Sequence, residues 1–174
     1  MRIKWFEWVA GTALVVSLVG TTGCGAVHHS ASFEPSFAAQ PGMLVEVASV
    51  TNTTGKSYEV DIISMLRDQL TTALQKESLL SQGGASGQQL AMDVKIIEYE
   101  EGDAFKRWLL PGWGETVLSV ECDLKRKADG RKVGSIQARR TVSVGGAYSI
   151  GAWRTIVESV SKDVVKEVQT KLRT

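Results

Sequence analysis

Only a few side chains in this sequence of 174 residues are suited to nucleophilic or metal chemistry. The histidines, His28 and His29, are adjacent, and no further histidine accompanies them, so a solvated pair is favoured over a metal site. Cys122 lies in a row of alternating apolar residues, which favours a core position over thiol chemistry. No histidine follows residue 29 to activate a serine or cysteine. We therefore expect no catalytic residue, no metal, no cofactor and no enzyme activity.

The second cysteine, Cys24, stands in a different context at the end of an apolar run. Arg2 and Lys4 give a basic start, Val9–Val19 is uncharged and apolar, and the residues at 20–23 are small. This layout is typical of a secretory signal peptide. The apolar segment has about eleven residues, whereas about twenty are needed to cross a bilayer as a helix. A permanent membrane-spanning helix is therefore disfavoured.

The dipeptide Gly23-Cys24 resembles the cleavage site of bacterial lipoprotein signals. That resemblance implies that residues 1–23 are removed and that Cys24 carries the lipid, including palmitate. It also implies sorting, because Gly25 in place of aspartate favours the outer membrane, with the protein facing the periplasm. The lipid would then be the membrane partner, since each buried methylene contributes about 0.8 kcal/mol. An ordinary cleaved signal with an incidental cysteine is the alternative.

The charge of the remaining chain excludes one class of partner. Without the 23 signal residues, 151 residues remain, with 18 basic and 18 acidic side chains. A neutral chain lacks the clustered positive charge that nucleic acid requires. Residues 24–42 are rich in small and polar types, which predicts a lipidated cysteine followed by a flexible tether spanning about 20 to 25 Å. Residues 43–174 are long enough for one domain.

Hydrophobic periodicity predicts the elements of that domain. Met43–Val50 has the composition of a strand, and a helix with Ser57 as its N-cap should follow. Two half-buried strands are expected where Leu90, Met92, Val94, Ile96 and then Leu118, Val120, Cys122, Leu124 alternate with mostly polar residues. Helical spacing marks two apolar stripes, Ile63, Leu66, Leu70, Ala73/Leu74 and Trp153, Val157, Val160, Val164, Val168, Leu172.

The turn at residues 127–132 decides how the last two strands pair. A two-residue loop at Asp129-Gly130 would place Cys122 opposite Gln137 and mix the core and solvent faces. A three-residue loop, 128–130, with Gly130 left-handed, places Cys122 opposite Ile136 instead. We predict the second register.

The element order is strand, helix, three strands and helix. This predicts an α+β fold with an antiparallel-rich sheet of about four strands and two helices on one face. The sequence resembles the bacterial envelope lipoprotein family catalogued as domain of unknown function forty-four ten, from about Phe33 to Leu172. The resemblance is carried by Gly23-Cys24, Phe33, "NTTG" at 52–55, "WLLPGWGE" at 108–115 and "ADGRKVG" at 128–134. More distantly, it is similar to the TolB amino-terminal domain and to LpoB, which implies a role in protein contacts.

Two motifs with possible chemistry are weak. Gly55-Lys56-Ser57 lies between a strand and a helix as in a phosphate-binding loop, but Val50 occupies the place of the first glycine. The acidic stretch at 98–103 matches no calcium loop, so a solvated acidic loop is favoured over a cation site.

The segment 107–115 is the strongest candidate site. Trp108, Leu109, Leu110 and Trp113 crowd a connection that Pro111 and two glycines interrupt. Exposed aromatic side chains in a loop often mark contact with a partner or lipid. The alternative is that the loop covers one end of the core. We therefore expect a non-enzymatic interaction or adaptor domain for an envelope component, with a small-ligand or lipid-binding carrier of the periplasm as the alternative.

Overall fold

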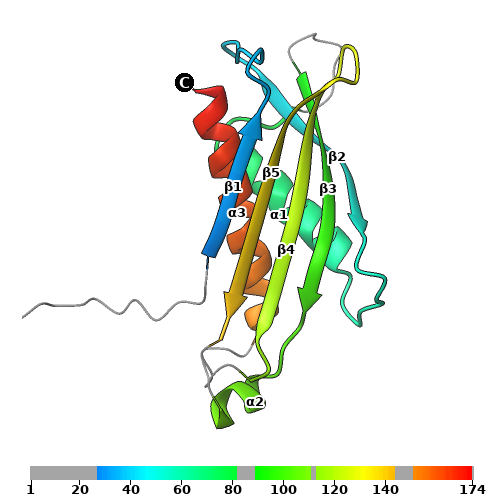
Figure 1. Ribbon diagram of the computed structural model, residues 1–174, viewed down its shortest axis with the longest axis vertical. Coiled ribbons are helices and arrows are strands. Elements are labelled where there is room, and N and C mark those ends of the chain that lie inside the picture. Colours follow the sequence, from blue (N-terminus) through cyan, green and yellow to red (C-terminus); the bar gives the residue numbers. More distant parts are fainter. Residues whose placement is uncertain (1–26, 82–88, 111–112, 144–150, 174) are drawn as a thin grey trace, which may run out of the picture.

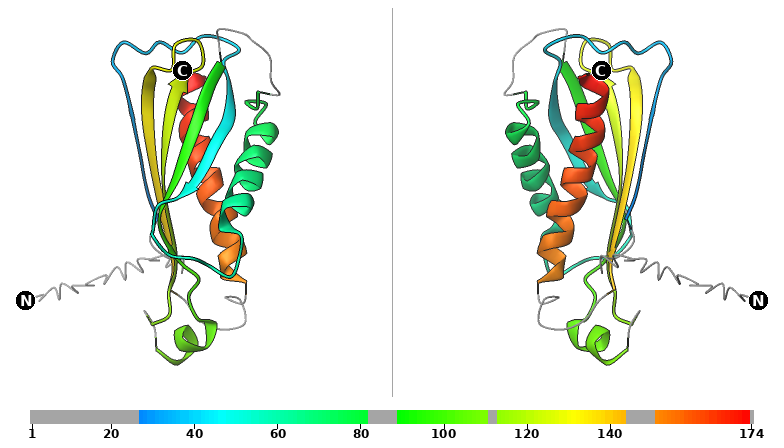
Figure 2. Two further views of the ribbon diagram at one scale, coloured as in Figure 1. Left: turned by 90° about the vertical axis from the view of Figure 1, so that its right-hand side faces the viewer. Right: turned by 90° about the vertical axis from the view of Figure 1, so that its left-hand side faces the viewer.

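The computed structural model describes residues 27–81, 89–110, 113–143 and 151–173 (Figure 1). Its elements are β1 (Val27–Phe33), β2 (Leu44–Asn52), α1 (Ile62–Lys76), β3 (Gln89–Glu100), α2 (Ala104–Leu109), β4 (Thr116–Arg126), β5 (Lys132–Val142) and α3 (Ala152–Leu172). The strands form one sheet in the order β1-β5-β4-β3-β2. Helices α1 and α3 cover one face of this sheet (Figure 2). The predicted α+β class and the two helices on one face are confirmed.

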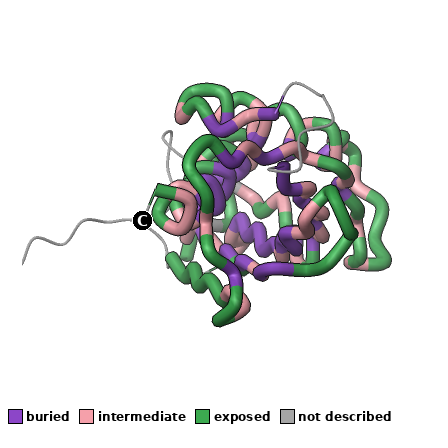
Figure 3. The backbone as a smooth tube through the Cα atoms, turned by 90° about the horizontal axis from the view of Figure 1, so that it is seen from above, coloured by how far each residue is buried: buried purple, intermediate pink, exposed green. Residues whose placement is uncertain are grey.

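The core lies between the sheet and the two helices, where buried segments gather in Figure 3. The two predicted apolar rows, Leu90, Met92, Val94, Ile96 on β3 and Leu118, Val120, Cys122, Leu124 on β4, are all 0% exposed. From α3, the predicted valines at 157, 160, 164 and 168 are buried against them. Alternation and helical spacing predicted these positions because one face of each element must leave water.

The sheet has five strands, so the prediction of about four was one short. The additional strand β1 lies inside the predicted tether and pairs antiparallel with β5, from Val27–Arg140 to Phe33–Gly134. Phe37 is also buried, in the connection to β2. Residues 27–42 are therefore part of the folded domain. The sequence signal for β1 is weak, because six of its seven residues are exposed and its apolar row is only Val27, Ala31 and Phe33, interrupted by His29.

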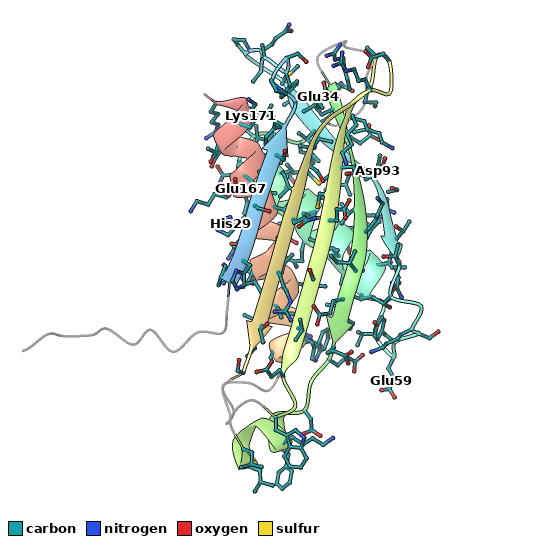
Figure 4. The ribbon with its side chains drawn as sticks, in the orientation of Figure 1. His29, Glu34, Glu59, Asp93, Glu167 and Lys171 are labelled. Atoms are coloured by element: carbon teal, nitrogen blue, oxygen red, sulfur yellow. The ribbon has the colours of Figure 1, made fainter. Side chains whose placement is uncertain are left out.

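Contacts with α3 hold β1 on the sheet (Figure 4). Nδ1 of His29 lies 2.7 Å from Oε1 of Glu167. The ring of Phe33 stacks on Phe37, with centroids 6.1 Å apart, and the ammonium of Lys171 lies 5.4 Å from the Phe33 ring centroid. A cation above an aromatic face is attracted by the ring quadrupole. The predicted solvated pair therefore does not hold for His29, because this residue makes a tertiary contact with Glu167.

One strand pair is parallel, which the antiparallel-rich prediction did not specify. Strand β2 runs parallel to β3, while the other three pairs are antiparallel. Helix α1 lies between β2 and β3 in the chain, and parallel neighbours need such a crossover. The free side of β2 is partly covered, because Val45 exchanges backbone hydrogen bonds with Leu79 and Ser81.

Helix α1 begins four residues later than predicted. Its N-cap is Asp61, whose Oδ1 accepts from the backbone N–H of Ser64 at 3.0 Å. Ser57 lies outside the helix, so its predicted capping role was wrong. Either side chain can cap a helix, and the buried stripe begins at Ile62, directly after the aspartate.

The β4–β5 hairpin has the predicted register. Cys122 lies opposite Ile136 and Val120 opposite Ala138, and Gly130 has a φ of +70°. The loop itself holds four residues, 127–130, closed by a 2.8 Å hydrogen bond from the Gly130 N–H to the Arg126 carbonyl. The register shifts by one between Leu124 and Lys125, which compensates for the longer loop.

No described helix is both long enough and apolar enough to cross a membrane.

Candidate contact site at the α2 tip

Helix α2 projects from one end of the sheet, in the connection from β3 to β4 (Figures 1 and 2). Asp103 is its N-cap, and Oδ1 of this residue accepts from the N–H groups of Phe105 at 2.9 Å and Lys106 at 3.1 Å. At the start of β4, the hydroxyl of Thr116 donates to the Glu101 carbonyl at 2.8 Å. The two ends of the connection are thus joined to each other where it leaves the sheet.

A glycine closes the base of this projection. The N–H of Asp103 donates to the Gly114 carbonyl at 2.8 Å. Gly114 has a φ of +71°, and a Cβ there would lie 2.8 Å from both the Asp103 carbonyl oxygen and Cβ of Lys106. Only glycine combines this left-handed conformation with such a close approach. Gly114, the second glycine of the "WLLPGWGE" motif, therefore serves the shape of the loop.

Apolar side chains are concentrated on the outside of the projection. Phe105 is 66% exposed, Leu109 53%, Leu110 54% and Trp113 50%. Among the described residues, only two other large apolar side chains, Val27 and Ile97, are exposed to a similar degree. We call Phe105, Leu109, Leu110 and Trp113 the α2 tip. Exposed apolar side chains gathered on one projection commonly mark an interaction surface.

Three of the four predicted contact residues belong to the α2 tip. Leu109, Leu110 and Trp113 are half exposed, so the alternative that they cover the core does not hold for them. Trp108 lies in α2, and its side chain falls outside the described part of the structure. Sequence reasoning missed Phe105, which precedes Leu109 by four residues. Helical i,i+4 spacing, which places two residues on one face, could have identified it.

The predicted lipidation site, Cys24, lies outside the described residues. Its lipidation and the removal of residues 1–23 remain predictions.

The "NTTG" motif at 52–55 closes its own loop. Oδ1 of Asn52 accepts from the Thr54 N–H at 3.0 Å, and its amide group donates to the Lys56 carbonyl at 2.8 Å. The hydroxyl of Thr54 in turn accepts from the Lys56 N–H at 3.2 Å. Two backbone N–H groups are therefore engaged within the loop, which differs from a loop whose N–H groups converge on phosphate.

The acidic stretch at 98–103 is divided among separate partners. Glu98 accepts from Nε and Nη2 of Arg139 at 2.9 and 3.2 Å, Glu100 pairs with Lys56, and Asp103 caps α2. Within the described ranges, no group of three or more histidine, cysteine, aspartate or glutamate residues could hold a metal ion.

Cys122 lies in the core between Val94 of β3 and Ile136 of β5. Burial raises the pKa of its thiol well above the ordinary value, so the reactive thiolate is disfavoured.

A groove of about 380 Å³ runs between α1 and α3. Ala73 and Val165 contribute apolar surface to it, and lysines at 76, 162 and 166 also line it. The carrier hypothesis placed a pocket between helices and sheet, whereas all residues around this groove come from the helices or directly follow α1.

The chain is thus a small α+β domain with exposed apolar side chains on a projection at one end of its sheet. Residues 35–146 match the family model described as Domain of unknown function (DUF4410), and the chain belongs to this family. The match begins before β2 and ends after β5, so it includes the α2 tip. No curated protein matches the sequence significantly.

Solved structures share the fold at low identity. PelC from Paraburkholderia phytofirmans, a dodecamer, is 18% identical and has a TM-score of 0.55, with 81% of this chain and 96% of that chain covered. The hypothetical protein CT253 from Chlamydia trachomatis is 9% identical with a TM-score of 0.55, covering 75% and 98%. A protein from Xanthomonas campestris assigned to DUF330 is 13% identical with a TM-score of 0.50, covering 78% and 94%.

Proposed function

We propose that this protein is a lipid-anchored lipoprotein of the bacterial envelope that acts as a non-enzymatic interaction or adaptor domain. The lipid on Cys24 holds it at the outer membrane, facing the periplasm, and the α2 tip contacts an envelope component. The observation that carries the proposal is the gathering of four exposed apolar side chains on one projection.

The construction of the projection supports a contact role. Its base is fixed by the Asp103–Gly114 hydrogen bond and by the Asp103 cap, so the apolar side chains are presented on ordered backbone. Ordering before binding reduces the entropy lost on association. Aromatic anchors at the centre of an interface commonly contribute about 2 kcal/mol or more. Phe105 and Trp113 are the side chains of that kind at the tip.

Two further features support the assignment. The arrangement of basic start, short apolar segment and Gly23-Cys24 supports the lipid anchor. PelC, which shares the fold, is a dodecamer, so association is one use of this fold in a similar protein.

A periplasmic carrier of small ligands is the second candidate, because the groove between α1 and α3 has the volume of a small-molecule site. Native mass spectrometry of the purified protein tests it. A bound small molecule that is lost on changing Ala73 to a larger residue would favour the carrier.

The contact role is tested by placing a photo-crosslinking amino acid at position 105 in the parent and in the double variant Leu109→Ser/Trp113→Ser. Because both changed side chains are half exposed, the variant should keep a melting temperature close to that of the parent. Crosslinked products from membranes should decrease strongly. Ile97→Ser is a matched control, since Ile97 is 44% exposed but lies on β3. Equal crosslinking in the parent and the double variant would contradict the contact role.

A further inference from the structure

The start of β1 and the α2 tip lie at the same end of the sheet. Strand β1 begins at Val27 and runs away from α2 (Figure 1). Val27 pairs with Arg140, two residues before Val142, and Val142 pairs with Thr116, where β4 begins after α2. At about 3.3 Å per residue, Val27 is about 7 Å along the strand from that edge.

The chain before β1 places a narrow limit on the position of the anchor. Cys24 precedes Val27 by three residues, which span at most about 10 Å when fully extended. Because residues 27–42 of the predicted tether belong to the folded domain, the expected standoff of 20 to 25 Å is not available. A lipid on Cys24 therefore brings the membrane to the end of the sheet from which α2 projects.

The chemistry of the α2 tip suits a bilayer surface. Phenylalanine, leucine and tryptophan are the side chains that amphipathic segments insert to a depth of about 5 to 10 Å, at the boundary of headgroups and acyl chains. Residues 103–115 contain two acidic and two basic side chains, so this segment is formally neutral. Among them, Asp103 and Lys106 lie 3.8 Å apart as an ion pair. Attraction to the surface would thus come from apolar burial.

We propose that the component contacted by the α2 tip is the membrane surface that holds the lipid on Cys24. The domain then touches the bilayer at two points, the anchor and the tip, and this fixes its orientation. The opposite end, with the β4–β5 hairpin, faces away from the membrane (Figure 1). The inference rests on the proposed lipid anchor and specifies the partner of the same site.

The test uses full-length protein matured in cells, purified from membranes and returned to phosphatidylcholine vesicles. A single cysteine is introduced by Leu109→Cys at the tip or, as a control, by Ala128→Cys in the exposed hairpin loop. Each is labelled with a nitrobenzoxadiazole maleimide, whose emission rises in an apolar environment. Cys122 is 0% exposed and should not react. The label at 109 should gain emission several-fold and be quenched by nitroxide lipids, while the label at 128 should behave as in water.

Added salt or anionic lipid should change the tip signal little, because screening acts on charge attraction and not on apolar burial. The variant Phe105→Ser/Leu110→Ser/Trp113→Ser in the Leu109→Cys background should lose the gain in emission. A second label position, Phe105→Cys, should repeat the result if Leu109→Cys impairs folding.

Water-like emission at 105 and 109 in vesicles that retain the lipidated protein would overturn the inference and leave the anchor intact. Crosslinks from position 105 to a protein, with no quenching by nitroxide lipid, would also overturn the inference. They would show that the α2 tip contacts a protein instead of the membrane. Labelling of the parent chain at Cys24, together with an intact mass lacking lipid, would overturn the anchor and the inference with it.

Discussion

Replacing Gly134 with alanine tests how β1 is held to the sheet. Gly134 lies on β5 opposite Phe33, the last residue of β1. A Cβ at position 134 would lie 2.4 Å from Cδ1, 2.7 Å from Cε1 and 3.1 Å from Cγ of the Phe33 ring. Such distances are well below van der Waals contact, so the ring must move. Moving it disturbs its stacking on Phe37 and its contact with Lys171.

The expected cost follows from this overlap. Forcing an extra methyl group into a packed site typically costs about 1 to 3 kcal/mol. Replacing glycine by alanine in a strand returns roughly 0.5 to 1 kcal/mol through the unfolded chain. We therefore expect Gly134→Ala to lower the free energy of unfolding by about 0.5 to 2 kcal/mol. For a domain of this size, each kcal/mol shifts the melting temperature by roughly 2 to 4 °C.

Chemical denaturation followed by circular dichroism measures the effect, and a double-mutant cycle with Phe33→Ala assigns it. Without the ring, the methyl group at position 134 has no close neighbour of that kind, so Gly134→Ala should be neutral or stabilising in the Phe33→Ala background. Equal destabilisation in both backgrounds would refute the reasoning, because the cost would then not arise from the ring.

Three further predictions concern the anchor, the core and the open face of the sheet. Cys24→Ser should abolish incorporation of a labelled fatty acid, and equal label in parent and variant would contradict the lipid anchor. Cys122→Ala should lower the free energy of unfolding by about 1 to 3 kcal/mol, because a fully buried group is lost. Crosslinking from position 105 should be unchanged. An unchanged denaturation midpoint with lost crosslinking would indicate a role for the thiol instead. For Asp123, burial raises the carboxyl pKa, but hydrogen bonds from Lys132 and Lys95 outweigh burial and hold the pKa below its ordinary value. Its stabilising contribution is therefore present above about pH 4 and is lost as the pH falls through the ordinary pKa toward the lowered one. The melting temperature of Asp123→Asn should thus fall less between pH 6 and pH 3 than that of the parent, and an equal fall would contradict this.

The sequence by itself determined the elements that build the core. Alternation placed Leu90 to Ile96 and Leu118 to Leu124 on the buried face, and all eight apolar positions are 0% exposed. The same alternation set the hairpin register, because a slip of one residue would exchange the core and solvent faces of β5. Family membership was also readable from short motifs. Two of them have local explanations, since Asn52 closes its own loop and Gly134 lies beneath Phe33.

The tertiary structure decided the elements that carry no such local signal. Strand β1 was not predicted, because its residues are mostly exposed and its apolar row is short and interrupted by His29. Its place depends on Phe33 meeting Gly134 across the sheet. The residue at which α1 begins was likewise decided only by the fold, since the side chains of Ser57 and Asp61 can both cap a helix. The sequence also did not decide whether the α2 tip is exposed, because a loop rich in tryptophan and leucine can cover a core or extend from it. Only the sheet register, which joins residues more than a hundred positions apart, shows that the tip and the start of β1 share one end.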